Sequence, residues 1–157
     1  MDTTEADHAL TMRVNIDGTL NTLRAMVPGV RAAGGGSIVL MSSLAGFRGN
    51  PMYASYVASK HAVVGIMRTA AKELGDDFIR VNTINPTIVD TPMTRGGRDG
   101  RAEPSFEERT NALRYRHALP ITHVEPIDVV NAARFLLSDA SRYVTGASLF
   151  VDAGASA

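Results

Sequence analysis

Apolar residues along the chain follow two different spacings, and each spacing predicts a different element. Between residues 8 and 33 the apolar side chains recur at roughly helical intervals, so this segment is predicted to be an amphipathic helix. The apolar positions of that helix are Leu10, Val14, Leu20, Leu23, Val27 and Val30. The glycines of AGGGS, at 33–37, end the helix, as glycine often does at helix C-termini.

Further strands and helices follow in alternation. SIVLMS, at 37–42, is a short continuous apolar run, which is typical of a strand buried on both faces of a parallel sheet. After a glycine-rich loop, the pattern predicts a helix at 53–74 and then a strand at 79–85, IRVNTIN, which leads into an extended loop. Another helix begins at Pro126, because proline is tolerated at the first helical position, and a last strand lies at 148–152. The expected buried face of the helix at 53–74 consists of Val57, Val64, Met67 and Leu74.

This order of elements predicts an α/β fold. Strands separated by helices pair in parallel, and the 157 residues suit one domain with a core of its own. Three strands are few for a doubly wound sheet, in which helices cover both faces. The sequence therefore predicts an incomplete doubly wound parallel sheet, with residues 1–157 as a single partial domain.

Composition and charge narrow the function classes. The formal net charge is zero, so nothing global indicates a nucleic acid or an anionic membrane as a partner. Cysteine is absent, which excludes disulfides, thiolate catalysis and cysteine-ligated zinc. No apolar run approaches the roughly 20 residues of a membrane helix, and the acidic start MDTTEADHAL does not resemble a signal peptide. These features predict a cytoplasmic protein with no membrane partner.

Tyr56 and Lys60 provide the first candidate chemistry. They lie four positions apart, and such positions share one face of a helix. A tyrosine has a pKa of about 10, and a nearby positive charge lowers it, which makes the phenol a usable acid or base near neutral pH. The alternative is a surface tyrosine beside a solvated lysine. Spacing alone favours that alternative, because Tyr-x-x-x-Lys is common.

Two serines strengthen the catalytic interpretation. Ser42 is the last residue of the strand at 37–42, and Ser43 follows it. Ligands of open α/β sheets bind at the carboxyl ends of the strands. Ser43 precedes Tyr56 by thirteen positions, so one loop could return a hydroxyl to the side of the phenol. A hydrolase with Ser42 or Ser43 as nucleophile is the competing class. It would need a Gly-x-Ser-x-Gly elbow, and LMSSLAG lacks the first glycine.

Several longer segments together resemble one protein family. VNIDGTLNT, IVLMSSLAG, YASYVASKHAVVGIMRTAAKEL, IRVNTINPTIVDTPM and YVTGASLFVDAGA follow one another from about Asn15 to Gly154. In this order they resemble the short-chain dehydrogenases/reductases (SDR), and five motifs in register make the resemblance specific. The chain is most similar to the carveol-dehydrogenase-like, mycofactocin-associated branch. The resemblance implies a Rossmann-like fold and hydride transfer between a nicotinamide cofactor and a secondary alcohol or ketone.

The resemblance also implies roles for single residues. Tyr56 matches the catalytic acid–base, and Lys60 matches the lysine that activates the tyrosine and binds the nicotinamide ribose. Ser43 matches the serine that orients the substrate oxygen; Ser42 is its rival by residue type, and the thirteen-residue offset selects Ser43. Asn15 matches the asparagine that helps to hold a water for proton relay to the lysine.

The loop after the strand at 79–85 matches the segment that contacts the nicotinamide. The resemblance implies that Pro86, Val89 and Thr91 join Tyr56 and Lys60 in binding the cofactor. The family usually has Pro-Gly at this point, whereas here Thr87 follows the proline. A simple strand-exit turn is the alternative for this loop.

The cofactor-binding half of the family has no counterpart in the sequence. A Gly-x-x-x-Gly-x-Gly turn after a strand holds the pyrophosphate on a helix N-terminus, and AGGGS precedes a strand instead. We therefore expect the C-terminal, catalytic part only: a truncated form that binds its cofactor poorly and leaves a strand edge and apolar helix faces uncovered. The residue that selects NAD or NADP lies in the half without a counterpart. The branch favours NAD, and NADP remains open.

A charged segment at 94–120 matches the substrate lid of the family. Its residues 106–116 are predicted to form a short helix, and a solvated charged surface is the alternative. The arginines of this region are Arg95, Arg98, Arg101, Arg109, Arg114 and Arg116. The four histidines form no metal-binding pattern, so no metal is predicted. The parent enzyme is expected to form homo-oligomers, and the alternative function for this chain is a non-catalytic fragment that associates with full-length SDR subunits.

Overall fold

The computed structural model describes residues 3–95 and 105–157. Its centre is a parallel sheet in the order β1 (Gly36–Met41), β2 (Ile79–Pro86) and β3 (Ser148–Val151). The three strands lie within two residues of their predicted bounds. The predicted α/β class and incomplete doubly wound parallel sheet are confirmed.

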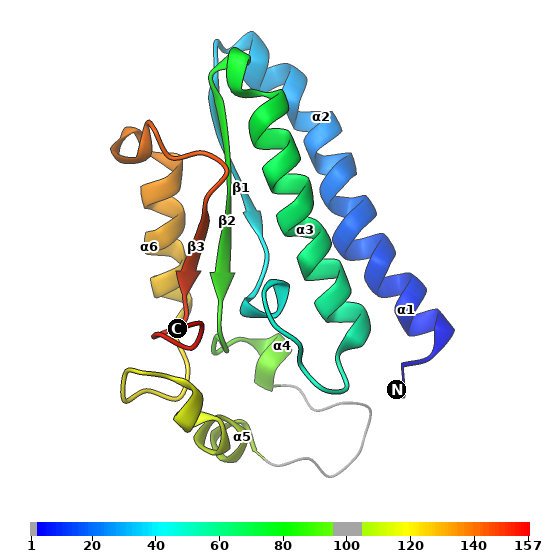
Figure 1. Cartoon of the computed structure of the whole chain (residues 1–157), viewed down its shortest axis with the longest axis vertical. Coiled ribbons are helices and arrows are strands. Elements are labelled where there is room, and N and C mark those ends of the chain that lie inside the picture. Colours follow the sequence, from blue (N-terminus) through cyan, green and yellow to red (C-terminus); the bar gives the residue numbers. More distant parts are fainter. Residues whose placement is uncertain (1–2, 96–104) are drawn as a thin grey trace.

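Helices cover both faces of this sheet. On one face lies a continuous helical rod made of α1 (Glu5–Met12), one π-helical turn (Arg13–Asp17) and α2 (Gly18–Ala32), together with α3 (Ala54–Glu73). On the other face lies α6 (Pro126–Leu137), which contacts all three strands. Figure 1 shows these three layers. The predicted helices at 8–33 and 53–74 are confirmed; the first begins earlier, at Glu5, and contains the π-turn that spacing did not predict.

Short elements gather at the carboxyl ends of β1 and β2. They are a 3-10 turn (Leu44–Gly46), α4 (Pro92–Arg95), α5 (Phe106–Ala112) and a second 3-10 turn (Arg114–Arg116). The predicted helix at 106–116 is thus divided into α5 and a 3-10 turn. Two further 3-10 turns, Gly75–Asp77 and Asp139–Ser141, lie at the opposite end of the sheet, away from α4 and α5.

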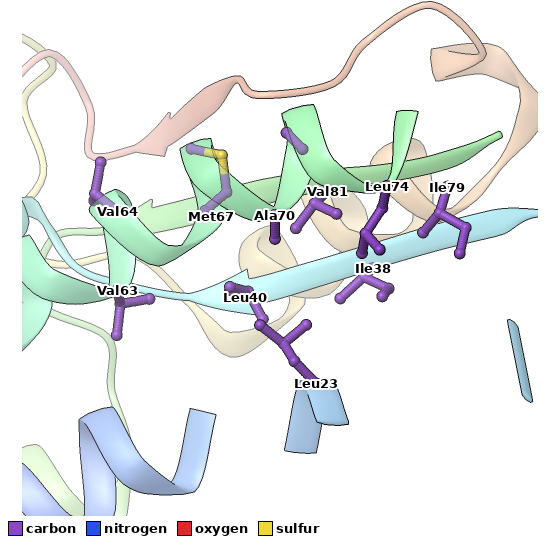
Figure 2. Close-up of a cluster of buried hydrophobic side chains, with 11 residues drawn as sticks. Leu23, Ile38, Leu40, Val63, Val64, Met67, Ala70, Leu74, Ile79 and Val81 are labelled. Carbon is purple, nitrogen blue, oxygen red and sulfur yellow. The ribbon is translucent and has the colours of Figure 1, made fainter. Parts of the chain in front are cut away.

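The core lies between the sheet and the first helical layer. Figure 2 shows one cluster to which α2, α3, β1 and β2 all contribute side chains. Val64, Met67 and Leu74 of the predicted helix face are buried, whereas Val57 is only half-buried. Within this layer, α3 supplies most of the buried side chains, which anchors the helix that carries Tyr56 and Lys60.

One side of the rod lacks a packing partner within the described residues. Leu10 and Val14 are 50% and 60% exposed, although their spacing marks them as an apolar helix face. The strand β1 forms one edge of the sheet. Both observations agree with the expectation of uncovered apolar faces and an uncovered strand edge. Among the described helices, none combines the length and the apolar character needed to cross a membrane.

Buried amides tie the last strand to the middle of the sheet. Asn82 of β2 is fully buried; its Nδ2 donates to the carbonyl of Val144 at 2.8 Å, and its Oδ1 accepts the N–H of Ala147 at 3.0 Å. Asn85 donates to the carbonyl of Leu149 at 3.2 Å. These side chains satisfy backbone groups of β3 and of the loop before it that would otherwise lack these partners.

The change Asn82→Ala is therefore expected to lower the free energy of unfolding by roughly 1–3 kcal/mol, because it leaves buried backbone groups unpaired. Denaturant unfolding of the purified chain measures this loss. Asn21→Ala is the matched control, since Asn21 is exposed and its side chain accepts a hydrogen bond from Arg24 on the helix surface. Equal stability of the two variants would contradict a structural role for the buried amide.

Candidate active site

A cavity of about 550 Å³ lies at the carboxyl ends of β1 and β2. Of the residues predicted to be functional, Ser43, Tyr56 and Pro86 line it. Its apolar wall comprises Leu44, Ile88, Met93, Phe106 and Leu113. This position agrees with the general rule that ligands of open α/β sheets bind outside the carboxyl ends of the strands. A second cavity, of about 500 Å³, lies between α2 and α3 and contains none of the predicted site residues.

The two serines after β1 have different surroundings. Ser42 is 4% exposed, and its hydroxyl donates to the carbonyl of Lys60 at 3.0 Å, so it joins the loop to α3. Ser43 lines the cavity, and its Oγ accepts the N–H of Ala45 at 3.1 Å. A side chain at Gly46 would lie 2.7 Å from Ser42 Oγ and 2.9 Å from the Lys60 carbonyl, so glycine permits this close packing. The loop thus faces the cavity with Ser43 and not with Ser42.

Tyr56 and Lys60 project from the first turns of α3. Both side chains are half-buried, and the ammonium Nζ of Lys60 lies 5.6 Å from the centre of the Tyr56 ring. The same Nζ donates to the carbonyl of Met41, the last residue of β1, at 3.0 Å. Burial lowers the pKa of Lys60 from its ordinary value. Because both side chains are half-buried and the Lys60 ammonium bonds a backbone carbonyl, they are not the surface tyrosine and solvated lysine of the alternative interpretation.

A hydrogen-bond chain connects Asn15 with the backbone of Tyr56. Nδ2 of Asn15 donates to Oγ of Ser59 at 3.0 Å, and Ser59, fully buried, donates to the Tyr56 carbonyl at 2.8 Å. Asn15 lies in the π-turn of the rod, a feature often found at functional sites. The structure therefore places the Asn15 side chain against α3, where it positions the turn that carries Tyr56. A water relay from Asn15 to Lys60 stays a prediction.

The predicted cofactor loop follows β2. Pro86, its first residue, is buried and pairs with Val151 of β3. Val89 forms an isolated parallel bridge with Val124, and Thr94 donates to the Val89 carbonyl. Thr94 also bonds the N–H and the hydroxyl of Thr91, at 3.1 and 3.2 Å. Val89 and Thr91 thus lie in a fixed loop beside the cavity, whereas Pro86 and Thr94 line it directly.

The described part of the lid-like segment at 94–120 covers this cavity. Its cavity-lining residues are Thr94, Phe106, Arg109, Thr110, Leu113, Arg116 and His117. The capping box of Ser105 and Glu108 begins α5 and so sets the position of this cover. Of the arginines singled out in the sequence, Arg98 and Arg101 lie outside the described residues.

Sequence reasoning gave no role to His117, which the structure places in the wall of the cavity. His117 is 5% exposed, and its Nε2 lies 3.0 Å from the hydroxyl of Thr87. Within the described residues, Nδ1 of His117 and Oδ2 of the buried Asp152 have no hydrogen-bond partner. Burial lowers the pKa of His117; the charge of Asp152 opposes this effect, and nearby arginines add to it. No sequence pattern joins Thr87, His117 and Asp152, which are far apart in the chain.

The lowered pKa of His117 predicts a loss of stability in acid. Protonation is easier in the unfolded chain, whose histidine has the ordinary value of 6.5, so unfolding is favoured as the pH falls through the lower pKa of the folded state. The stabilisation is fully present above 6.5. Between about pH 8 and pH 5, the thermal midpoint of the wild type is expected to fall more steeply than that of His117→Gln. Parallel curves for the two proteins would contradict this assignment.

Asp90, His123 and Glu125 also come together, although the sequence predicts no metal site. Their ligand atoms lie within 4.8 Å of one another. Arg95 pairs with both oxygens of Asp90, and this hydrogen-bonded ion pair lowers the pKa of the carboxyl. His123 Nε2 lies 3.3 Å from Glu125 Oε1. The arginine already supplies the positive charge that a cation would bring, so this group serves to hold the loop before α6.

Comparison with known proteins identifies the family. The sequence matches the family model described as enoyl-(acyl carrier protein) reductase over residues 1–156. The chain belongs to the short-chain dehydrogenase/reductase family, as the motifs of the sequence predicted.

Individual relatives match nearly the whole of this chain, but the match covers only part of their own length. A putative short-chain type dehydrogenase/reductase of Mycolicibacterium smegmatis is 44% identical over 97% of this chain and 57% of its own length. The (-)-trans-carveol dehydrogenase of Rhodococcus erythropolis is 43% identical over 90% of this chain and 53% of its own length. The crystal structure of carveol dehydrogenase from Mycobacterium avium in complex with NAD superimposes with a TM-score of 0.92 at 40% identity, covering 98% of this chain and 58% of that one. The chain thus spans little more than half the length of these relatives.

Proposed function

We propose that this cavity is the catalytic site of an oxidoreductase that interconverts a secondary alcohol and a ketone. The observation that carries the proposal is the joint position of Ser43 and Tyr56 in one cavity, with the Lys60 ammonium 5.6 Å from the tyrosine ring. A hydroxyl donor, a proton-transfer group and a cation are what the reduction of a carbonyl requires of the protein, beside a cofactor that supplies the hydride. Membership in the short-chain dehydrogenase/reductase family supports the same conclusion.

Each of these residues has a separate task in the reaction. Ser43 donates its hydroxyl hydrogen to the substrate carbonyl and so holds the oxygen beside Tyr56. When the carbonyl carbon gains a hydride, Tyr56 gives its proton to the oxygen, which becomes the alcohol. Lys60 stabilises the phenolate that remains, because a nearby positive charge favours the ionised form. In the direction of oxidation the same proton returns to Tyr56.

We propose NAD as the cofactor, which supplies or accepts the hydride when bound. The described residues suit its nicotinamide end: Lys60 offers an ammonium for the ribose, and the loop of Pro86, Val89 and Thr91 is held beside the cavity by Thr94. The solved relative from Mycobacterium avium is a complex with NAD. NADP shares this nicotinamide end, so the same residues suit it equally.

Cyclic secondary alcohols suit the shape and lining of the cavity. The wall combines Leu44, Ile88, Met93, Phe106 and Leu113 with polar side chains that include Ser43 and Tyr56. Among the relatives, one is named a carveol dehydrogenase and another a 3-alpha-(or 20-beta)-hydroxysteroid dehydrogenase, the latter 38% identical. A ketone ring that packs on the apolar wall can direct its oxygen to Ser43 and Tyr56.

The second candidate is a non-catalytic chain that associates with full-length subunits of the same family. The exposed Leu10 and Val14 and the uncovered edge of β1 favour it. Such a chain would co-purify with a longer relative and would show no turnover of its own.

Reduction of a cyclic ketone by the purified chain, at millimolar NADH, distinguishes these candidates. The wild type is expected to consume NADH, and Ser43→Ala to do so roughly 10- to 100-fold more slowly, since one hydrogen bond to developing charge is lost. Ser42→Ala is the matched control; its hydroxyl bonds the Lys60 carbonyl, so it should lose stability more than rate. Absence of turnover would favour the non-catalytic candidate. Cofactor-independent ester cleavage that Ser43→Ala abolishes would favour a hydrolase.

A further inference from the structure

The charged side chains that line the cavity, among the described residues, are all arginines. Among the described residues that line the cavity, Arg48, Arg109 and Arg116 are cationic, and none is an aspartate or a glutamate. His117 adds a further nitrogen-bearing side chain to the same wall. A neutral ketone or alcohol needs no such concentration of positive charge. The wall therefore contains more cationic groups than the proposed reaction uses.

Arg48 and Arg116 are two positive charges in this wall that act on each other. Arg48 is half-buried, and its Nη1 donates to the carbonyl of Ala155 at 3.0 Å, which holds the guanidinium in place. Burial lowers the pKa of Arg48, and the positive charge of Arg116 lowers it further. Asp152 acts in the opposite direction, but its buried carboxylate does not line the cavity. Two like charges thus line one cavity, and Asp152, which opposes their effect on Arg48, is not among the residues that line it.

The Arg116 side chain also contacts the neighbouring Tyr115. Its guanidinium lies 5.8 Å from the ring centre of Tyr115, and its Nε lies 3.4 Å from the Tyr115 hydroxyl. A stacked guanidinium keeps its planar edge available for an oxyanion, which arginine binds through two parallel hydrogen bonds. Two guanidiniums that line one cavity offer the kind of donors that bind a carboxylate.

Building on the proposed function, we propose that the substrate is an oxo or hydroxy carboxylate with an apolar body. Arg48 and Arg116 bind its carboxylate, while Ser43 and Tyr56 hold its carbonyl or carbinol oxygen. The oxyanion of a phosphate ester would satisfy the same donors. The apolar wall favours the carboxylate, because a single negative charge is cheaper to remove from water than the double charge of a phosphate.

Binding without cofactor tests this proposal independently of turnover. The probes are 4-oxocyclohexanecarboxylate and its amide, titrated calorimetrically into the whole chain; the two differ in charge and hardly in shape. The carboxylate is expected to bind roughly 10- to 100-fold more tightly than the amide, as charge-assisted hydrogen bonds would give. Arg48→Gln and Arg116→Gln should each lose most of this preference. Tyr56→Phe should keep it, because it leaves both guanidiniums in place.

Arg142→Gln is the matched control. Its guanidinium lies 5.1 Å from the ring centre of the adjacent Tyr143, an arrangement like that of Arg116 and Tyr115. Arg142, however, follows the turn Asp139–Ser141, at the end of the sheet away from the cavity. This control should keep the full preference, and Arg48→Lys should retain a part of it. Thermal unfolding of Arg48→Gln shows whether loss of the bond to the Ala155 carbonyl unsettles the fold; Arg116→Gln leaves that bond intact.

Three results would overturn the proposal. They are equal affinity for the acid and its amide, a preference that survives in both arginine variants, and stronger competition by inorganic phosphate than by the carboxylate. Reduction of both ketones with equal efficiency would uphold the proposed function and contradict the carboxylate site. Tight, arginine-dependent binding of the acid without any reduction would uphold the carboxylate site and contradict the proposed function.

Discussion

Tyr56→Phe is expected to reduce the turnover of a cyclic ketone by about 100- to 10,000-fold, the range that one positioned acid–base group contributes. The substitution removes a single oxygen atom and leaves the ring in the wall of the cavity, so its effect reports proton transfer and not packing. Tyr56 is also the only cavity-lining tyrosine in the described residues that lies on the same helix face as a lysine. The measurement is the rate of NADH consumption at saturating ketone.

Tyr53→Phe provides the matched control for this loss. Tyr53 lines the same cavity but is 46% exposed and precedes α3. Removal of its hydroxyl is expected to cause a much smaller loss than removal of the Tyr56 hydroxyl. Comparable rates in the two variants would contradict the assignment of Tyr56 as the proton donor. Unchanged binding of the ketone by Tyr56→Phe would locate the effect in the chemical step.

Lys60→Met is expected to lower the rate roughly 10- to 1,000-fold, the effect of a nearby opposite charge on an ionising group. The methionine keeps most of the volume of the buried stem and removes the ammonium beside the Tyr56 ring. It also removes the hydrogen bond to the Met41 carbonyl, which joins α3 to the end of β1. Thermal unfolding in parallel therefore separates a loss of stability from a loss of rate.

The pH dependence distinguishes the charge of Lys60 from its packing. Burial lowers the pKa of Lys60 below 10.5, so its positive charge is lost as the pH rises through that lowered value. The advantage of the wild type over Lys60→Met should shrink over the same rise. Lys60→Arg, which keeps the charge, should recover part of the rate at neutral pH. A constant ratio of rates across all pH values would contradict an electrostatic role.

Periodicity predicted the elements because the core is regular. The helix at 53–74 carries apolar residues on one face, and the structure buries Val64, Met67 and Leu74 against the sheet. The same rule could not predict the buried Asn82 and Asn85 of β2. Their amides bond backbone groups that precede or belong to β3, about sixty residues later in the chain, and such partners have no sequence signature.

The candidate site was predictable to a similar extent. Spacing on α3 made Tyr56 and Lys60 candidates, and the resemblance to the family selected them. The thirteen-residue offset favoured Ser43 over Ser42, and the structure places Ser43 in the cavity and directs the Ser42 hydroxyl to the Lys60 carbonyl. His117, Thr87 and Arg48 were missed, because the cavity assembles them from separate loops. Spacing reports neighbours on one element, whereas a wall built from several loops becomes visible only in three dimensions.

Deuterium transfer from the cofactor tests whether this cavity reduces a ketone with Tyr56 and Lys60. The purified chain would be incubated with a cyclic ketone and with NADH deuterated at the transferred position of the nicotinamide ring, and the alcohol would be analysed by mass spectrometry. The account predicts one deuterium on the carbinol carbon of the product, and a product yield that falls sharply in Tyr56→Phe and Lys60→Met. Alcohol without deuterium, an equal yield in the Tyr56 variant, or no alcohol at millimolar NADH would contradict it.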